Sequence, residues 1–130
     1  METLTKICII GFGGFTGAVL RYFISGWVQT SSGSFLFPFG TMAVNMIGCF
    51  FIGMGSYLVE YRSMFTIETR QFILVGLLGS FTTFSTFSNE TINLLRENRI
   101  DLATINVALQ VIFGLLLVWA GRIVSALLWR

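Results

Sequence analysis

A block rich in hydroxyl groups and phenylalanine lies between positions 79 and 90. It is written Gly-Ser-Phe-Thr-Thr-Phe-Ser-Thr-Phe-Ser-Asn-Glu, so six hydroxyl residues and three phenylalanines share twelve positions. Ser and Thr compete with a helical backbone for hydrogen bonds, and Gly79 tolerates dihedral angles that other residues avoid. The block could therefore break a helix, and the freed carbonyl oxygens could hold a small cation. An unbroken helix with a hydroxyl-rich packing face is the alternative.

The phenylalanines of this block suggest a second kind of chemistry. Phe81, Phe84 and Phe87 recur at every third position, which is usually a core or lipid-facing stripe. Here, however, Phe84 and Phe87 enclose Ser85 and Thr86. The edge of an aromatic ring carries partial positive charge. Ring edges that alternate with hydroxyl donors could line a path for a small anion without a full charge that would trap it.

Small and polar residues recur at helical spacing in three other segments. They are Gly13, Gly17 and Arg21; Thr41, Asn45, Gly48 and Gly55; and Asn106, Gln110 and Gly114. Residues four apart share a helix face, so these faces could pack closely against neighbouring helices. The amide of Asn45 must satisfy its donors and acceptor away from water, so it could serve packing or a path. Arg21 is expected near the end of its helix, where it could reach the membrane surface or serve the path.

The elements that must position these residues are membrane spans. Of the 130 residues, 55% are hydrophobic and only 11% are charged, whereas roughly a quarter are charged in a soluble domain. Uncharged runs cover 7–20, 22–59, 71–89 and 102–121. The second run is too long for one span of about 20 residues, and its polar stretch, 29–34, is expected to be a loop. Pro38 falls near the start of the next helix, where its missing N–H costs little.

We therefore predict an all-α membrane protein with one domain, residues 1–130. Its four transmembrane helices are expected near 4–28, 36–60, 70–95 and 102–128, and the third is expected to be broken near its middle.

Composition and charge limit the possible functions. Histidine is absent, which removes the usual general base, and short connections leave enzyme chemistry no obvious place. The net charge of +2 is scattered, which argues against a nucleic-acid partner. Four helices leave little space for a pathway within one chain, so a pathway between two copies, most simply a homodimer, is expected.

The distribution of basic residues gives a weak bias in orientation. Both termini are expected on one side of the membrane, with Lys6, Arg62, Arg70, Arg122 and Arg130, against Arg96, Arg99 and Arg21 on the other. A fixed orientation with the termini inside and insertion in both directions both remain open.

Three segments resemble signature blocks of the fluoride ion channel family (Fluc, also called CrcB). They are Gly-Ala-Val-Leu-Arg-Tyr at 17–22, Pro-Phe-Gly-Thr-Met-Ala-Val-Asn-Met-Ile-Gly at 38–48, and the block at 79–90. The resemblance covers the first three predicted helices, and its most specific part is Thr-Thr-Phe-Ser-Thr-Phe-Ser-x-Glu. The fourth helix is similar only in general character.

This resemblance implies an assembly and a set of site residues. The assembly is an antiparallel, dual-topology homodimer with two fluoride pores in the cell (inner) membrane. It also holds a central structural sodium ion on the backbone carbonyls of Gly79 and Thr82. The family often has Gly-Gly where this chain has Gly79-Ser80, but a backbone ligand at Gly79 survives that difference. The residues implied along the fluoride path are Phe84 and Phe87, Ser85 and Thr86 as a polar track, Asn45 at the pore and Arg21 near its entrance.

The function that the resemblance implies is passive export of fluoride from the cytoplasm, which limits fluoride toxicity. A small multidrug–proton antiporter is the alternative, since it also has four helices, but it needs a carboxylate deep in the membrane. The first predicted helix has no Asp or Glu between Thr5 and Val28, and Glu90 comes late in the third. A non-conducting structural subunit would explain the glycine-rich faces but not the block at 79–90.

Overall fold

The computed structural model describes residues 2–129, and its regular elements within that range are helices. They are α1 (Glu2–Ser32), α2 (Phe39–Arg62), α3 (Ile67–Arg70), the π-helical segment η1 (Gln71–Leu78), α4 (Gly79–Phe81), α5 (Phe84–Arg96) and α6 (Ile100–Leu128). Four stretches are long and apolar enough to cross a membrane, and α3 to α5 together form the third of them. The predicted set of four apolar helices is confirmed. Met1 and Arg130, and with them the limits of the predicted domain, lie outside the described residues.

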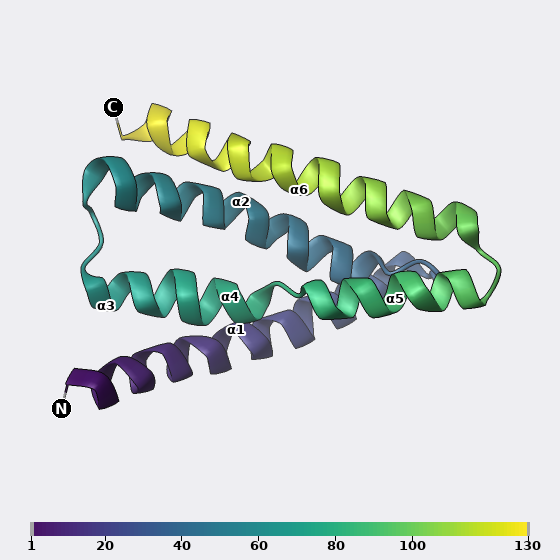
Figure 1. Cartoon of the computed structure of the whole chain (residues 1–130), viewed down its shortest axis with the longest axis horizontal. Coiled ribbons are helices and arrows are strands. Elements are labelled where there is room, and N and C mark those ends of the chain that lie inside the picture. Colours follow the sequence, from purple (N-terminus) through teal and green to yellow (C-terminus); the bar gives the residue numbers. More distant parts are fainter. Residues whose placement is uncertain (1, 130) are drawn as a thin grey trace.

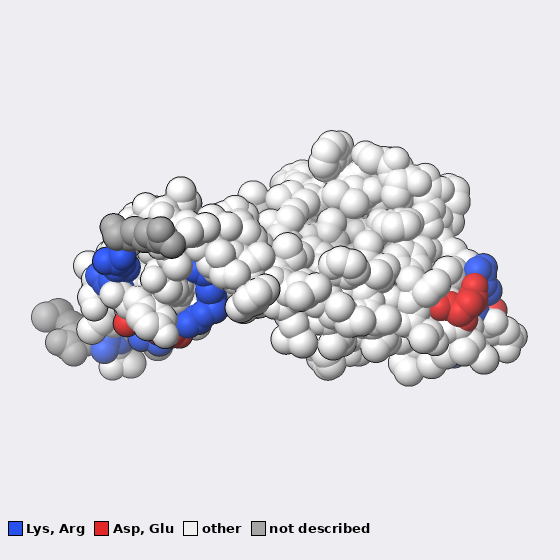
Figure 2. Space-filling view, turned by 90° about the horizontal axis from the view of Figure 1, so that it is seen from above, with Lys and Arg blue, Asp and Glu red and all other residues white. Residues whose placement is uncertain are grey.

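The four spans run back and forth, so the two ends of the chain lie at the same end of the molecule (Figure 1). The α2–α3 connection lies at this end, and the α1–α2 and α5–α6 connections lie at the other (Figure 1). We call the end that carries the α1–α2 and α5–α6 connections the loop end. Figure 2 shows Lys, Arg, Asp and Glu gathered toward the two ends, with uncharged residues over the wide middle of that face. This distribution matches a bilayer, in which charges are costly at the centre.

The first helix is longer than the sequence predicts, and the expected loop at 29–34 is wrong over most of its length. α1 continues through Ser32 because the polar side chains bond back to the chain. The Gln29 Nε2 donates to the carbonyls of Ser34 at 2.6 Å and Phe37 at 3.1 Å, and its Oε1 accepts from the Gly40 N–H at 2.9 Å. One side chain thus holds the whole turn and the start of α2.

The expected position of Arg21 and the expected starts of two helices are corrected. Arg21 does not lie near the end of its helix, because α1 ends eleven residues later, at Ser32. Pro38 lies next to the first residue of α2, near the start of the helix as expected, but α2 begins at Phe39 instead of near 36 and the third span begins at Ile67 instead of near 70. These shifts leave the order and number of the spans unchanged.

Glycines allow two pairs of helices to approach closely. A Cβ at Gly17 of α1 would overlap the Leu77 carbonyl oxygen of η1, and one at Gly76 would lie 2.7 Å from the Ile10 carbonyl oxygen. A Cβ at Gly53 of α2 would overlap the Val118 carbonyl oxygen of α6. On α1 the predicted small-residue face therefore brings backbones into contact, as expected for membrane helices. On α2 the backbone contact is made by Gly53, which was not among the predicted residues, whereas the predicted Gly48 and Gly55 face side chains of Thr82 and Leu74.

Candidate functional site

The third span breaks at Thr82 and Thr83, within the block that the sequence singles out. Thr82 has φ −90° and ψ 156°, and Thr83 has φ −150° and ψ 113°, so both are extended. α5 begins directly afterwards because the Thr83 hydroxyl caps it, accepting the Thr86 N–H at 3.2 Å. On the other side of the break, the Ser80 hydroxyl donates to the Gly14 carbonyl at 2.8 Å and so ties α4 to α1.

The break removes hydrogen-bond partners from two carbonyl groups. In a continuous helix the Thr83 N–H would donate to the Gly79 carbonyl, and the Thr86 N–H to the Thr82 carbonyl. Instead, the Thr83 N–H donates to Asn45 Oδ1 at 2.8 Å and the Thr86 N–H donates to the Thr83 hydroxyl. The carbonyls of Gly79 and Thr82 therefore lack the N–H donors that a continuous helix would give them, and carbonyl oxygens of this kind are what a hard cation prefers.

The side chain of Asn45, on α2, bonds to the backbone at the break. Its Nδ2 donates to the Thr83 carbonyl at 3.2 Å and to Gln110 Oε1 at 2.7 Å. Gln110 Nε2 donates in turn to Asn106 Oδ1 at 3.0 Å, and Asn106 Nδ2 donates to Thr91 Oγ1 at 2.9 Å. Asn106 and Gln110 were predicted to share a polar packing face but were given no defined role at the path, and the structure shows that this face forms hydrogen bonds to α2 and α5.

A cavity of about 320 Å³ opens beside the break, between α2, the third span and α6. Phe84 and Phe87 both line it, but their exposure differs, because Phe84 is 79% exposed and Phe87 is 9% exposed. Their ring centroids are 5.5 Å apart at an angle of 55°. Asn45, Gly79, Thr82, Thr83 and Gln110 are among the other lining residues.

A smaller cavity of about 190 Å³ lies between α1, α2 and the start of α5. Arg21 lines it together with Thr86. A guanidinium group and hydroxyl groups therefore lie on the side of the break that faces α1. Its other lining residues include Ser25, Thr41 and Thr83.

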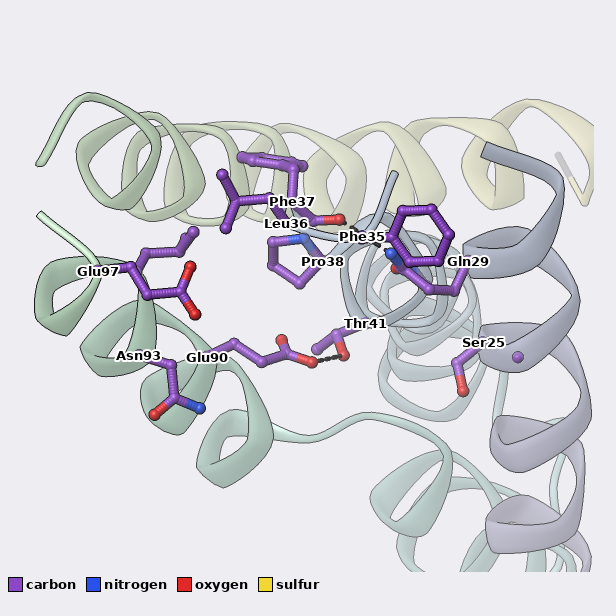
Figure 3. A pocket seen from close by; sticks show the side chains of 13 residues that line it. Ser25, Gln29, Phe35, Leu36, Phe37, Pro38, Thr41, Glu90, Asn93 and Glu97 are labelled. Atoms are coloured by element: carbon purple, nitrogen blue, oxygen red, sulfur yellow. Dashed lines mark hydrogen bonds between the residues drawn. The ribbon is translucent and has the colours of Figure 1, made fainter. Parts of the chain in front are cut away.

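The largest of these cavities, about 490 Å³, lies at the loop end, and Figure 3 shows its side chains. The Thr41 hydroxyl donates to Glu90 Oε1 at 2.6 Å across it (Figure 3). The second carboxyl oxygen of Glu90 is buried without a hydrogen-bond partner among the described residues. Glu90 directly follows the uncharged run at 71–89 and was not predicted as a site residue, although an acid in the second half of a membrane span is a usable signal. Gln29, Asn93 and Glu97 also line this cavity.

The three cavities follow one another through shared walls. Ser25 and Thr41 line both the 490 Å³ and the 190 Å³ cavity, and Thr83 lines both the 190 Å³ and the 320 Å³ cavity. The three cavities thus lie at the loop end and on two sides of the break, and the phenylalanine pair lines the last of them. Ser85 is exposed, with its hydroxyl 3.3 Å from that of Thr83, and it is not among the lining residues of the three cavities.

Comparisons with known proteins match nearly the whole chain. The family model described as CrcB-like protein, Camphor Resistance (CrcB), matches residues 8–122. A relative from Methanosarcina acetivorans named fluoride-specific ion channel FluC 1 is 49% identical over 117 residues, covering 90% of this chain and 88% of the relative. A fluoride-specific ion channel FluC from Methanococcus vannielii is 43% identical over 124 residues, covering 93% and 96%. Another, from Shewanella putrefaciens, is 44% identical over 119 residues, covering 92% and 94%.

These findings agree with the arrangement of the helices. Four apolar helices and the family match make the chain a multi-pass membrane protein. With a family model matched over residues 8–122 and relatives above 40% identity along most of their length, the chain belongs to the CrcB-like protein family.

Proposed function

We propose that this chain forms a passive, fluoride-selective channel that exports fluoride from the cytoplasm across the cell inner membrane and so limits fluoride toxicity. The observation that carries this proposal is the set of three cavities at the loop end and around the break at Thr82 and Thr83, which share Ser25, Thr41 and Thr83 as wall residues. The relatives, each named a fluoride-specific ion channel, support the choice of ion. Conduction makes and breaks no covalent bond, so the protein acts without enzyme chemistry.

Fluoride is strongly hydrated, so the path must replace its water with hydrogen-bond donors. Arg21 and Thr86 supply a guanidinium group and a hydroxyl at the 190 Å³ cavity. Phe84 and Phe87 supply ring edges at the 320 Å³ cavity, where Asn45 lies beside them. Ser85 lies at the exposed side of the break and joins this path once a second copy covers it. Selectivity then follows from the width of the path and the placement of the donors.

The channel in this proposal is an antiparallel homodimer whose subunits insert in both orientations. The support is the exposed face at the break, because Phe84 is 79% exposed and Gly79 is also exposed. A second copy would cover this face and complete the wall of the path. Both ends of the subunit carry basic residues, with Lys6, Arg62 and Arg70 at one and Arg96 and Arg99 at the other, which permits both orientations.

A structural sodium ion belongs to the same proposal. The carbonyls of Gly79 and Thr82 would hold it, since the break removes the hydrogen bonds that a helix would give them. The ion would supply positive charge between the two subunits. Gly79 suits this position because it is exposed, and a Cβ there would have only the Leu74 carbonyl oxygen nearby, at 3.7 Å.

The test of function is fluoride efflux from liposomes that contain only this protein, measured with a fluoride electrode. We expect fluoride to leave and chloride to stay, at a rate that an imposed proton gradient does not change. Efflux that follows the proton gradient would instead support an antiporter. If liposomes with the protein released fluoride no faster than protein-free vesicles, the proposal would be contradicted.

A further inference from the structure

We propose that Asn45 serves conduction as a positioning residue, through a hydrogen-bonded relay that Gln110, Asn106 and Thr91 complete. The relay fixes the extended segment at Thr83 in place. Its role in conduction rests on the proposed channel function, whereas its effect on Thr83 can be measured without any ion.

The amide of Asn45 has no donor left for an ion. A carboxamide has two N–H donors, and those of Asn45 go to the Thr83 carbonyl at 3.2 Å and to Gln110 Oε1 at 2.7 Å. Its oxygen accepts the Thr83 N–H at 2.8 Å. Both backbone polar groups of Thr83 are therefore satisfied by one side chain. Asn45 replaces the neighbouring helical turn that the break has removed.

The remaining links run in a single direction. Gln110 donates to Asn106 at 3.0 Å, Asn106 donates to Thr91 at 2.9 Å, and the Thr91 hydroxyl donates to the Phe87 carbonyl at 2.8 Å. Each amide accepts through its oxygen and donates through its nitrogen, so every bond polarises the next in the same sense. The relay begins at Thr83, passes through side chains of α2 and α6, and returns to the first turn of α5. It therefore connects three helices around the break.

Burial makes the relay sensitive to the loss of any link. Asn106 is 0% exposed and Gln110 is 9% exposed, so water does not replace a missing partner easily. A buried amide that loses its partner carries the full cost of desolvation. The loss of one link therefore favours rearrangement of the next amide, and the disturbance reaches Asn45 and Thr83.

Thr91 offers the cleanest test, because it ends the relay and does not line any of the three cavities described above. Thr91→Val removes the hydroxyl and keeps the shape, whereas Thr91→Ser keeps the hydroxyl. Thr104→Val is the matched control on α6, because the exposed Thr104 hydroxyl bonds, among residues 2–129, to the Ile100 carbonyl of its own helix alone. Hydrogen exchange at the Thr83 amide and fluoride efflux as a function of fluoride concentration are measured for each variant.

We expect Thr91→Val to speed exchange at the Thr83 amide and to lower the maximal efflux, each by about three- to tenfold, the effect of losing one neutral hydrogen bond. The fluoride concentration that gives half-maximal efflux should stay unchanged, because no ligand of the ion is lost. Thr91→Ser and Thr104→Val should behave like the unaltered protein.

Unchanged exchange at Thr83 in both Thr91→Val and Gln110→Met would overturn the relay. A raised half-maximal concentration in Asn45→Ala, with Thr83 exchange unchanged, would make Asn45 a direct ligand and would also overturn it. If the unaltered protein released no fluoride, the proposed function would fail, and the exchange data alone would decide whether the relay holds Thr83.

Discussion

Phe84 and Phe87 are close neighbours with different surroundings. The side chain of Phe87 is 9% exposed and is enclosed by its own subunit, whereas that of Phe84 is 79% exposed. Their rings nevertheless meet at 5.5 Å beside the same cavity. The environment of Phe84 must therefore come from a second copy or from lipid, and only that of Phe87 is set within the chain.

Replacement of either ring should reduce fluoride efflux from liposomes, because isoleucine has no positively polarised ring edge to offer an anion. Phe87→Ile should also lower the stability of the isolated subunit by about 1–3 kcal/mol, the usual effect of a changed shape in a packed core. Phe84→Ile should leave that stability nearly unchanged. Efflux and thermal unfolding, measured on both variants, separate the two effects. Normal efflux in both would remove the rings from the mechanism.

At the scale of elements, α1 shows how glycine position decides helix contact. Gly17 faces η1, where a Cβ would overlap the Leu77 carbonyl oxygen and lie close to the Ser80 hydroxyl. Gly11 lies on the same helix but has nothing within 4 Å of its Cβ position. The two glycines share a helix and a residue type, so they differ mainly in what they contact.

Gly17→Ala should destabilise the protein by about 1–3 kcal/mol, because α1 must move away from η1 and Ser80 must lose its bond to Gly14. Gly11→Ala is the matched control. It should be neutral or stabilising by up to about 1 kcal/mol, since alanine favours a helix more than glycine does. Unfolding of both variants in detergent measures the difference. If the two variants were equally stable, α1 and η1 could move apart at Gly17 without loss of stability, which would contradict the prediction.

At the scale of the whole molecule, the break lies on an exposed face of the chain. The cavity beside it is open, and Gly79 and Phe84 on its wall are exposed. Two copies that meet through this face would bring two pairs of Gly79 and Thr82 carbonyls together. A cation shared between them would then contribute directly to the stability of the dimer.

Removal of sodium should therefore weaken the dimer. Binding to the assembled form alone stabilises it by about 2.7 kcal/mol when sodium is present at a hundred times its dissociation constant. We expect dimers in sodium-free buffer to dissociate at higher protein concentration, and sodium to restore them better than potassium or magnesium. Size-exclusion chromatography over a dilution series measures this effect. A dimer that is indifferent to sodium would contradict the proposed ion site.

The sequence by itself determined the four spans and their order, and it indicated where the third could be interrupted. A bilayer acts on each residue separately, so apolar runs and the crowding of hydroxyl groups after Gly79 carry this information without knowledge of any contact. The small-residue faces were predictable for the same reason, because spacing along one helix defines them.

Only the tertiary structure decided where α1 ends, where Arg21 lies and what Asn106 and Gln110 do. Gln29 extends α1 by bonding a turn up to eleven residues ahead, and Asn45 meets Gln110 across 65 positions of the chain. Such pairs exist only when separate helices bring polar atoms within about 3 Å of each other. Periodicity within a single helix does not specify that distance, so the relay and the cavities around the break depend on the packing of the helices.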